Sequence, residues 1–163
     1  MEISIRPIGL SDAGQINEIR RQKEIVWNTL ALPTEYKENT IQFIQNLGEN
    51  DYVVVAESDS SILGMAGLHV GEGKKRHKGM VGICIHKDYH NQGIGRLLLE
   101  YLLDLADNWL MLKRVELEVL EGNNRAIHLY ESLGFVYEGT KKYATIQNGR
   151  YASEIIMGRY RRD

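Results

Sequence analysis

Cysteine and long apolar runs are scarce in this sequence. Its 163 residues include one cysteine, Cys84, which excludes an internal disulfide and a metal site built from a cysteine cluster, so we expect no metal cofactor. No apolar run approaches the roughly 18 residues that a membrane-spanning helix needs. Residues 1–7 also lack the basic-then-apolar pattern of a signal peptide. We therefore expect a protein of the reducing cytoplasm with no membrane partner.

Neither positive nor negative charge dominates the sequence, which has 20 Lys and Arg residues and 22 Asp and Glu residues. The net charge is -2, which argues against a protein whose main partner is nucleic acid. The apolar content of 43% and the charged content of 26% are ordinary for a globular protein, and the length suits one domain with a full hydrophobic core. No repeat, low-complexity tract or linker interrupts the chain, so a single domain over residues 1–163 is expected.

Hydrophobic periodicity predicts the order β-α-α-β-β-β-α-β-α-β-β, which indicates an α/β fold with a mixed central sheet and helices on both faces. The first helix is predicted to continue to about residue 27, and the second to begin with Thr34 as its N-cap and to end at Gly48. The loop between them is apolar. We expect Leu30 and Leu32 to anchor this loop on the core; the alternative is that they form a wall of a substrate pocket.

The most informative stretch, residues 81–96, reads as a short apolar strand, a polar turn and two glycines that open a long helix. Unpaired N–H groups and the helix dipole make such a turn suitable for a phosphate. Gly93 and Gly95 lack a Cβ, so phosphates can lie directly on the backbone. A P-loop needs Lys and Ser or Thr after its glycines, and a dinucleotide fingerprint needs a third glycine where Leu98 stands. The stretch alone predicts a phosphate site or a helix start that binds nothing.

Two carboxylates alternate with apolar residues in the segment from Val115 to Val119. The period of two places Glu116 and Glu118 on one strand face and the apolar residues on the other. Carboxylates in this arrangement usually form a solvated exterior. If this face lines a cleft, burial and like-charge repulsion raise one carboxyl pKa and produce a base suited to neutral pH.

The turn from Tyr89 to Gly95 and the segment from Asn123 to Phe135 together resemble the GNAT superfamily of acetyl-CoA-dependent N-acetyltransferases. The second segment, Asn-x-x-Ala-Ile-x-Leu-Tyr-Glu-x-Leu-Gly-Phe, is the more specific of the two, and the predicted order of elements fits the family fold along the whole chain. The family turn usually carries Gln or Arg where this chain has His90. The side chain at this position therefore departs from the family pattern, whereas the backbone contacts of the turn do not depend on it.

The resemblance implies acetyl-CoA as co-substrate and assigns its contacts to a strand, a turn and a helix start. The backbone of the strand is expected beside the thioester, the N–H groups of the turn at the pyrophosphate, and an asparagine side chain at the cofactor arm. The residues in that order are Ile83, Cys84 and Ile85; Asn91, Gln92, Gly93, Ile94, Gly95 and Arg96; and Asn123. Tyr130 is expected to direct its hydroxyl at the thioester sulfur and to act as a general acid.

A base must also accept the proton of the amine, and the sequence offers several candidates. Glu118 is the expected base, because related peptide N-terminal acetyltransferases carry a catalytic glutamate at this place. Glu116, His86 and an ordered water are the alternatives. An acetyl-cysteine intermediate on Cys84 is not expected, because this residue lies within the apolar strand as a small buried side chain.

The resemblance implies direct attack of an amine on the thioester within a ternary complex. The chain looks most like a bacterial branch that acetylates small-molecule amines, including free L-amino acids. A polyamine and the N-terminus of a ribosomal protein are alternative acceptors, and a non-catalytic acetyl-CoA-binding module is a rival of another class. A homodimer is common in the family.

Overall fold

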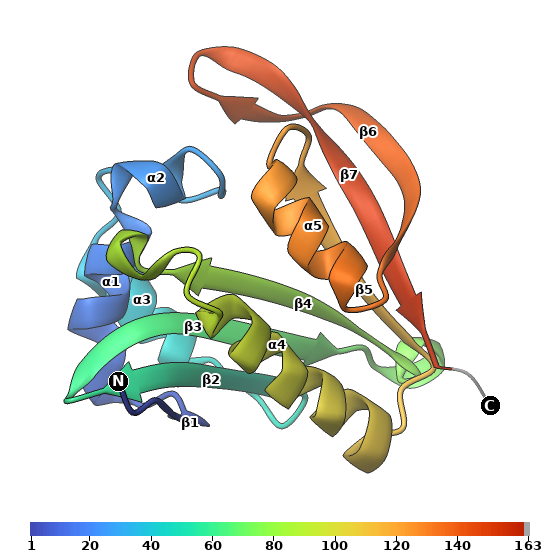
Figure 1. The fold of residues 1–163 in the computed structure, drawn as a ribbon, viewed down its shortest axis with the longest axis horizontal. Helices are drawn as coiled ribbons and strands as arrows, with labels where there is room; N and C mark the ends of the chain where they lie inside the picture. Colours follow the sequence, from blue (N-terminus) through green and yellow to red (C-terminus); the bar gives the residue numbers. More distant parts are fainter. Residues whose placement is uncertain (162–163) are drawn as a thin grey trace.

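The computed structural model describes residues 1–161, which form a seven-stranded mixed sheet with helices around it (Figure 1). The strands are β1 (Ser4–Pro7), β2 (Asp51–Ser58), β3 (Ser61–Val70), β4 (Lys78–Ile85), β5 (Arg114–Leu120), β6 (Val136–Gln147) and β7 (Arg150–Tyr160). The helices are α1 (Ala13–Arg20), α2 (Lys23–Val26), α3 (Lys37–Gln45), α4 (Ile94–Asp104) and α5 (Asn124–Ser132). A π-helical turn, Leu105–Trp109, extends α4. The predicted fold class is confirmed.

The sheet opens in its middle, between β4 and β5. Its strand order is β1-β2-β3-β4-β5-β7-β6, and β4 and β5 run parallel while every other neighbouring pair in the described sheet is antiparallel. The parallel pairing covers only Lys78–Met80 against Arg114–Glu116. Beyond these residues the two strands diverge, as Figure 1 shows. Backbone groups on the facing edges of β4 and β5 therefore lack strand partners along the divergent part.

Two hydrophobic clusters hold helices on opposite faces of the sheet. On one face, Leu98 and Leu102 of α4 pack in a cluster with Val54 of β2. On the other, Ile16 of α1 packs in a second cluster with Val55 of β2. Successive strand residues point to opposite faces, so Val54 and Val55 join different clusters as the period of two requires. In Figure 1, α4 lies in front of β2 and β3, and α1 and α3 lie behind.

The first helical region is broken, which corrects the prediction of one helix to about residue 27. α1 ends at Arg20, and Gln22 is extended with ψ of 138° before the short α2 begins. The side chain of Gln22 accepts a hydrogen bond of 2.9 Å from the N–H of Lys87. A partner that is distant in the sequence thus holds Gln22 outside the helix, and the new direction of α2 brings the loop that follows over the end of β4.

The second long helix, α3, begins at Lys37 with Tyr36 as its N-cap and ends at Gln45, so the predicted boundaries at Thr34 and Gly48 are wrong. The reason is a contact made before the helix starts. The guanidinium of Arg20 donates to the carboxylate of Glu35 at 2.9 Å and 3.1 Å, which fixes Glu35 against α1.

The apolar loop before α3 is anchored by a smaller residue than expected. Leu30 and Leu32 are 76% and 66% exposed, whereas Ala31 between them is buried. The hydroxyl of Thr29 donates to the Ile25 carbonyl at 2.8 Å and accepts from the N–H of Ala31, which turns the chain at this point. The expectation that the two leucines anchor the loop on the core is therefore wrong.

Two other local predictions are confirmed. Val115, Leu117 and Val119 are buried on one face of β5, and the glutamates lie on the other face. The β6–β7 hairpin turns at Asn148 and Gly149, whose φ values of 52° and 78° are those of a tight hairpin turn. Among residues 1–161, the helices are too short or too polar to span a bilayer.

Candidate active site

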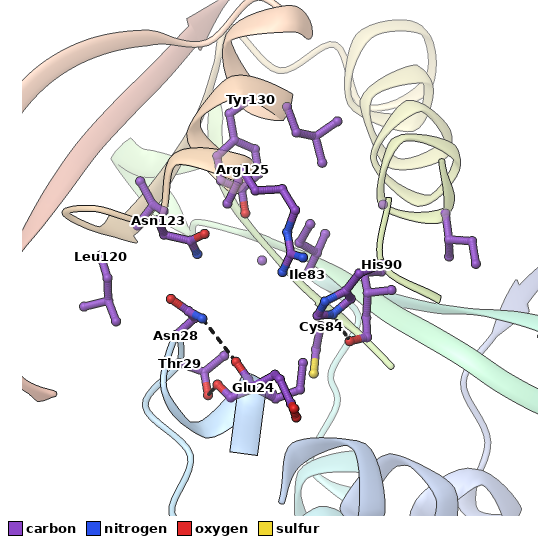
Figure 2. A pocket seen from close by; sticks show the side chains of 18 of the residues that line it. Glu24, Asn28, Thr29, Ile83, Cys84, His90, Leu120, Asn123, Arg125 and Tyr130 are labelled. Carbon is purple, nitrogen blue, oxygen red and sulfur yellow. Dashed lines mark hydrogen bonds between the residues drawn. The ribbon is translucent and has the colours of Figure 1, made fainter. Parts of the chain in front are cut away.

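A cleft with a volume of about 610 Å³ occupies the divergence of β4 and β5. Its walls come from the end of β4, the turn before α4, the ends of β5 and β7, the first turns of α5 and residues 24–30 (Figure 2). Every predicted site residue except Gln92 lines it. These residues are Ile83, Cys84, Ile85, Asn91, Gly93, Ile94, Gly95, Arg96, Glu118, Asn123 and Tyr130.

The glycine turn, residues 91–96, presents main-chain donors to one end of the cleft. Asn91 and Gly93 have φ values of 60° and 82°, a left-handed conformation that glycine adopts without strain. The first N–H of α4 that bonds inside the helix is that of Leu97, to the Gly93 carbonyl at 3.1 Å. Within residues 1–161, the N–H groups from Asn91 to Arg96 have no hydrogen-bond partner. Several unpaired N–H groups at a helix start suit an anionic ligand.

The main-chain edge of β4 forms a second wall. The N–H of His86 donates to the Leu63 carbonyl of β3 at 2.9 Å. Hydrogen bonding alternates along an antiparallel pair, so the N–H of Cys84 also points to β3 while those of Ile83 and Ile85 point to the opposite edge. That edge faces the divergent β5, so these two N–H groups can donate to a polar atom in the cleft.

His90 supports this edge. Its ring Nε2 lies 2.8 Å from the Ile85 carbonyl oxygen. Because a carbonyl only accepts hydrogen bonds, Nε2 carries the proton in this contact. Burial lowers the pKa of His90, against the opposing effect of this hydrogen bond, and the positive charge of Arg125 lowers it further. The imidazole is therefore neutral near pH 7, and it caps a carbonyl where the strand loses its neighbour.

The side chains of Asn123, just before α5, and of Tyr130, within α5, point toward the cleft in Figure 2. Asn123 stands at the N-cap of α5, but its side chain makes no capping hydrogen bond and is free to meet a ligand. Tyr130 is 6% exposed and packs edge-on against Phe135. Burial is the cause that raises the pKa of Tyr130 to about 12. The tyrosine thus offers a neutral O–H donor.

A pair of carboxyl groups lies across the cleft from the turn. In the β5–β7 register Leu120 faces Glu154 and Glu118 faces Ile156, so Glu118 and Glu154 are diagonal neighbours on one face. Lys141 donates to Glu118 at 2.7 Å. That bond, together with one from Glu154, holds the pKa of Glu118 below its usual range, whereas burial and the neighbouring Glu118 raise the pKa of Glu154. The pair therefore combines a stable charge with a carboxyl group that holds its proton more firmly.

Sequence reasoning missed Glu154. The segment from Tyr151 to Met157 predicts a strand, but nothing within it marks one glutamate as functional. Glu154 meets Glu118 only through the register of β5 and β7, and it is 9% exposed in the folded chain. The alternation of carboxylates on β5 predicted that one member of a carboxyl pair has a raised pKa. It paired Glu116 with Glu118, whereas the carboxyl group with the raised pKa is that of Glu154.

The alternative bases lie outside the cleft. Glu116 accepts bonds of 2.9 Å from Lys78 and from Arg114. Burial acts to raise the pKa of Glu116, but these two bonds outweigh it and keep the pKa below its usual range. His86 accepts the N–H of Asp88 at 3.1 Å and thereby caps a short turn. Neither residue lines the cavity.

Cys84 does line the cleft, with its sulfur directed away from the α5 side chains (Figure 2). Burial raises the pKa of its thiol to about 11. A thiol with that pKa is protonated near neutral pH and is a weak nucleophile. Residues 1–161 contain no group of three His, Cys, Asp or Glu residues placed to hold a metal ion.

Comparison with known proteins identifies the family. The model of the acetyltransferase (GNAT) family matches residues 15–135. The chain is 31% identical over 161 residues to the L-amino acid N-acetyltransferase AaaT of Escherichia coli K12, which covers 97% of this chain and 98% of that one. It is 45% identical over 86 residues to the ribosomal protein bS18-alanine N-acetyltransferase of the same organism, over 48% of this chain and 52% of that one.

A solved structure shows the same fold. The protein yncA of Salmonella typhimurium, determined with its cofactor acetyl-CoA, superposes with a TM-score of 0.83 at 22% identity, over 97% of this chain and 93% of that one. The family match covers both sequence motifs and every residue of the cleft lining except Glu154. The chain belongs to the GNAT acetyltransferase family and is an acetyl-CoA-dependent N-acetyltransferase.

Proposed function

We propose that the protein transfers the acetyl group of acetyl-CoA to the primary amine of a small molecule, most readily a free L-amino acid, within a ternary complex. The observation that carries the proposal is the composition of the cleft: unpaired N–H groups at the glycine turn and a carboxyl pair on β5 and β7. The first suits the pyrophosphate of the acyl donor, and the second suits an amine that must lose a proton.

The residues fit coenzyme A along one path. The N–H groups of residues 91–96 would hold its pyrophosphate, the edge of β4 from Ile83 to Ile85 would lie beside its pantetheine arm, and Asn123 would bond that arm. A Cβ on Gly95 would stand 3.2 Å from a methyl group of Leu129, so the glycine also lets α4 and α5 approach each other closely. When bound, acetyl-CoA supplies an acetyl group already activated as a thioester.

The β4 edge acts on the acetyl oxygen, and the carboxyl pair acts on the amine. The N–H groups of Ile83 and Ile85 are placed to donate to the acetyl oxygen, where negative charge develops as the nitrogen–carbon bond forms. An ammonium group loses one proton to the solvent before it can attack, and the nitrogen of the neutral amine loses one further proton as the amide forms. Glu154 takes up this proton, directly or through a water, and Glu118 keeps the pKa of Glu154 raised.

Tyr130 acts at the other product, the thiolate of CoA, when the carbon–sulfur bond breaks. The pKa of Tyr130 is about 12, whereas an ordinary thiol has a pKa of about 8.5. A full proton transfer from the tyrosine to the thiolate is therefore unfavourable. The hydroxyl instead donates a hydrogen bond that stabilises the leaving thiolate, which refines the general-acid role expected from the sequence.

Three acceptor classes compete within this chemistry. The relative that matches along nearly the whole chain acetylates L-amino acids, and this supports the first choice. The match to the ribosomal protein acetyltransferase is confined to about half of the chain, so it says less about the acceptor wall. A polyamine would be favoured by the carboxyl pair. A non-catalytic acetyl-CoA-binding module would need neither Tyr130 nor Glu154.

The test is the release of free CoA from acetyl-CoA in the presence of single amino acids, polyamines and short peptides, with the acetylated product identified by mass spectrometry. We expect amino acids to give the highest kcat/KM. Turnover with spermidine alone, or with peptides alone, would replace the acceptor assignment, and tight acetyl-CoA binding without any turnover would contradict the enzymatic role. A single domain, a homodimer and a cytoplasmic location stay predictions that limited proteolysis, light scattering and cell fractionation can check.

A further inference from the structure

A second pocket lies on the face of the sheet that α1 and α3 cover. Its volume is about 320 Å³, at the lower end of the roughly 300–1,000 Å³ that is usual for small-molecule sites. Most of its lining is apolar and comes from β2, β3, β4, α2 and α3. The principal apolar residues are Ile25, Phe43, Val53, Met65, Met80 and Val81.

Glycine keeps this pocket open. Gly67 of β3 and Gly82 of β4 face each other in the register, and both line the pocket. A Cβ built on Gly82 would meet no atom within 4 Å, so the space that a side chain would occupy there is empty. A glycine pair in the middle of two strands weakens a sheet. In return, the absence of side chains at Gly67 and Gly82 leaves this cavity open.

The second pocket joins the cleft at the reacting centre. Ile25, Thr29, Gly82, Ile83 and Cys84 line both cavities. Met80 faces Glu116 in the β4–β5 register, and side chains alternate along a strand, so Gly82 and Cys84 share a sheet face with Glu118. An amine held by the carboxyl pair therefore has the second pocket beside it on the same face.

The charges around the second pocket favour one kind of acceptor. Its lining contains Arg20 and His69 but, over residues 1–161, no acidic side chain. Arg20 binds Glu35 through Nε and Nη2, and His69 binds Asp51 at 2.7 Å. The distal ammonium of a polyamine would find no carboxylate on these walls, whereas an apolar group would cover apolar surface that is exposed at Phe43 and Met80.

We infer that the second pocket takes the side chain of the acceptor and selects amino acids whose side chains are apolar. The inference rests on the proposed function and adds to it the substrate class. The α-amine lies at the carboxyl pair, the side chain passes Cys84 and Thr29, and its end enters the space that Gly82 and Gly67 leave open beside Met65. An added methylene in such a pocket changes kcat/KM by roughly tenfold or more.

The test compares the wild type with Gly82→Val on glycine, L-alanine, L-leucine, L-phenylalanine, spermidine and an alanine-headed tripeptide. We expect wild-type kcat/KM to rise from glycine to leucine and phenylalanine. Valine at position 82 should lower kcat/KM for the two large amino acids by at least tenfold, chiefly through KM, and by less than threefold for alanine. Gly139→Val is the matched control, because Gly139 is also a strand glycine with open space around it but lines neither cavity.

A second variant separates pocket size from damage to the cleft. Met65 faces Cys84 in the β3–β4 register and lines the second pocket but not the cleft, so Met65→Ala should enlarge the pocket and improve phenylalanine relative to alanine by at least threefold. A wild type without size preference, or a Gly82→Val variant that loses all acceptors equally while Met65→Ala changes nothing, would overturn the inference.

If no amine is turned over, the proposed function fails and the pocket is judged by binding. L-leucine is then titrated calorimetrically into the CoA-saturated wild type and Gly82→Val. Binding that weakens at least tenfold in the variant supports the pocket, and the absence of binding to the wild type overturns it.

Discussion

The glycine turn and the carboxyl pair face the same cleft but are built in opposite ways. The turn presents main-chain N–H groups to the cleft, and its side chains at Asn91 and Gln92 are exposed. The carboxyl pair presents side chains whose charges depend on burial and on one another. Binding by backbone tolerates side-chain replacement and fails when the conformation changes, whereas chemistry by carboxyl groups fails when one side chain changes.

The sharpest test of this contrast is Glu154→Gln, which keeps the shape of the side chain and removes the base. Loss of a general base lowers kcat by roughly 1,000-fold. In the wild type the raised pKa of Glu154 means that activity falls as pH drops through that pKa, because the protonated carboxyl group cannot accept the amine proton. In the variant the part of the acid limb that Glu154 causes should disappear, and the part that protonation of the amine causes should remain. Steady-state kinetics from pH 5 to about pH 9 measure both effects.

Stability provides the control for that variant. A carboxyl pKa raised in the folded state means that the fold binds this proton more tightly than the unfolded chain, so stability falls as pH rises through the raised pKa. Glu154→Gln removes this cost, and its Tm at pH 8 should equal or exceed that of the wild type. Glu116→Gln, on the same sheet face but outside the cleft, should keep kcat within about threefold. Comparable losses in both variants would contradict the assignment.

Tyr130→Phe should give the next largest effect, because it removes one hydroxyl donor from a buried position and leaves the ring packed on Phe135. Removal of one donor to a developing charge lowers kcat by roughly 100-fold. The dissociation constant of acetyl-CoA, measured by calorimetry, should stay within about twofold, because the ring contacts remain. An acetyl-CoA affinity that falls as much as kcat would show a binding role instead.

Gly93→Ala tests the opposite wall. Gly93 has φ of 82°, and an L-residue held in a left-handed conformation costs about 1–2 kcal/mol. If the turn must keep this conformation to bind the pyrophosphate, the KM for acetyl-CoA should rise roughly tenfold while kcat changes little. Gln92→Ala is the matched control, because Gln92 directs its side chain to the Asp88 carbonyl and does not line the cleft. Equal effects of the two changes would contradict recognition by the main chain.

The same division explains what the sequence could predict. The turn and the segment from Asn123 to Phe135 are local patterns, in which each residue's role follows from its neighbours in the chain, so the cofactor wall was predictable. The pairing of Glu118 with Glu154 depends on the register of β5 and β7, which no local pattern encodes. The break in the first helix likewise depends on a bond between Gln22 and Lys87. The proposed acceptor wall depends on such long-range contacts, and for that reason the sequence did not predict that Glu154 lies beside Glu118.

His90 should show the smallest effect, although it is the position where this chain departs from its family. The ring donates to the Ile85 carbonyl at 2.8 Å, and a glutamine amide can donate to the same oxygen. His90→Gln should therefore keep kcat and the KM for acetyl-CoA within about threefold. Burial lowers the pKa of His90, so the wild-type ring is already neutral near pH 7 and the replacement should not move the acid limb of the rate profile.

The comparison that decides the role of His90 is His90→Leu, which fills similar space without a donor. It leaves the Ile85 carbonyl unpaired at the edge where β4 has lost its neighbour, at a cost of about 1–3 kcal/mol in the free energy of unfolding. Chemical denaturation of both variants measures this difference. A leucine variant as stable as the glutamine variant would show that the hydrogen bond is dispensable, and a shifted rate profile in His90→Gln would show that the imidazole titrates during turnover. If the leucine variant is less stable and the rate profile of His90→Gln is unchanged, His90 is a neutral residue that stabilises the β4 edge of the cleft through its bond to Ile85.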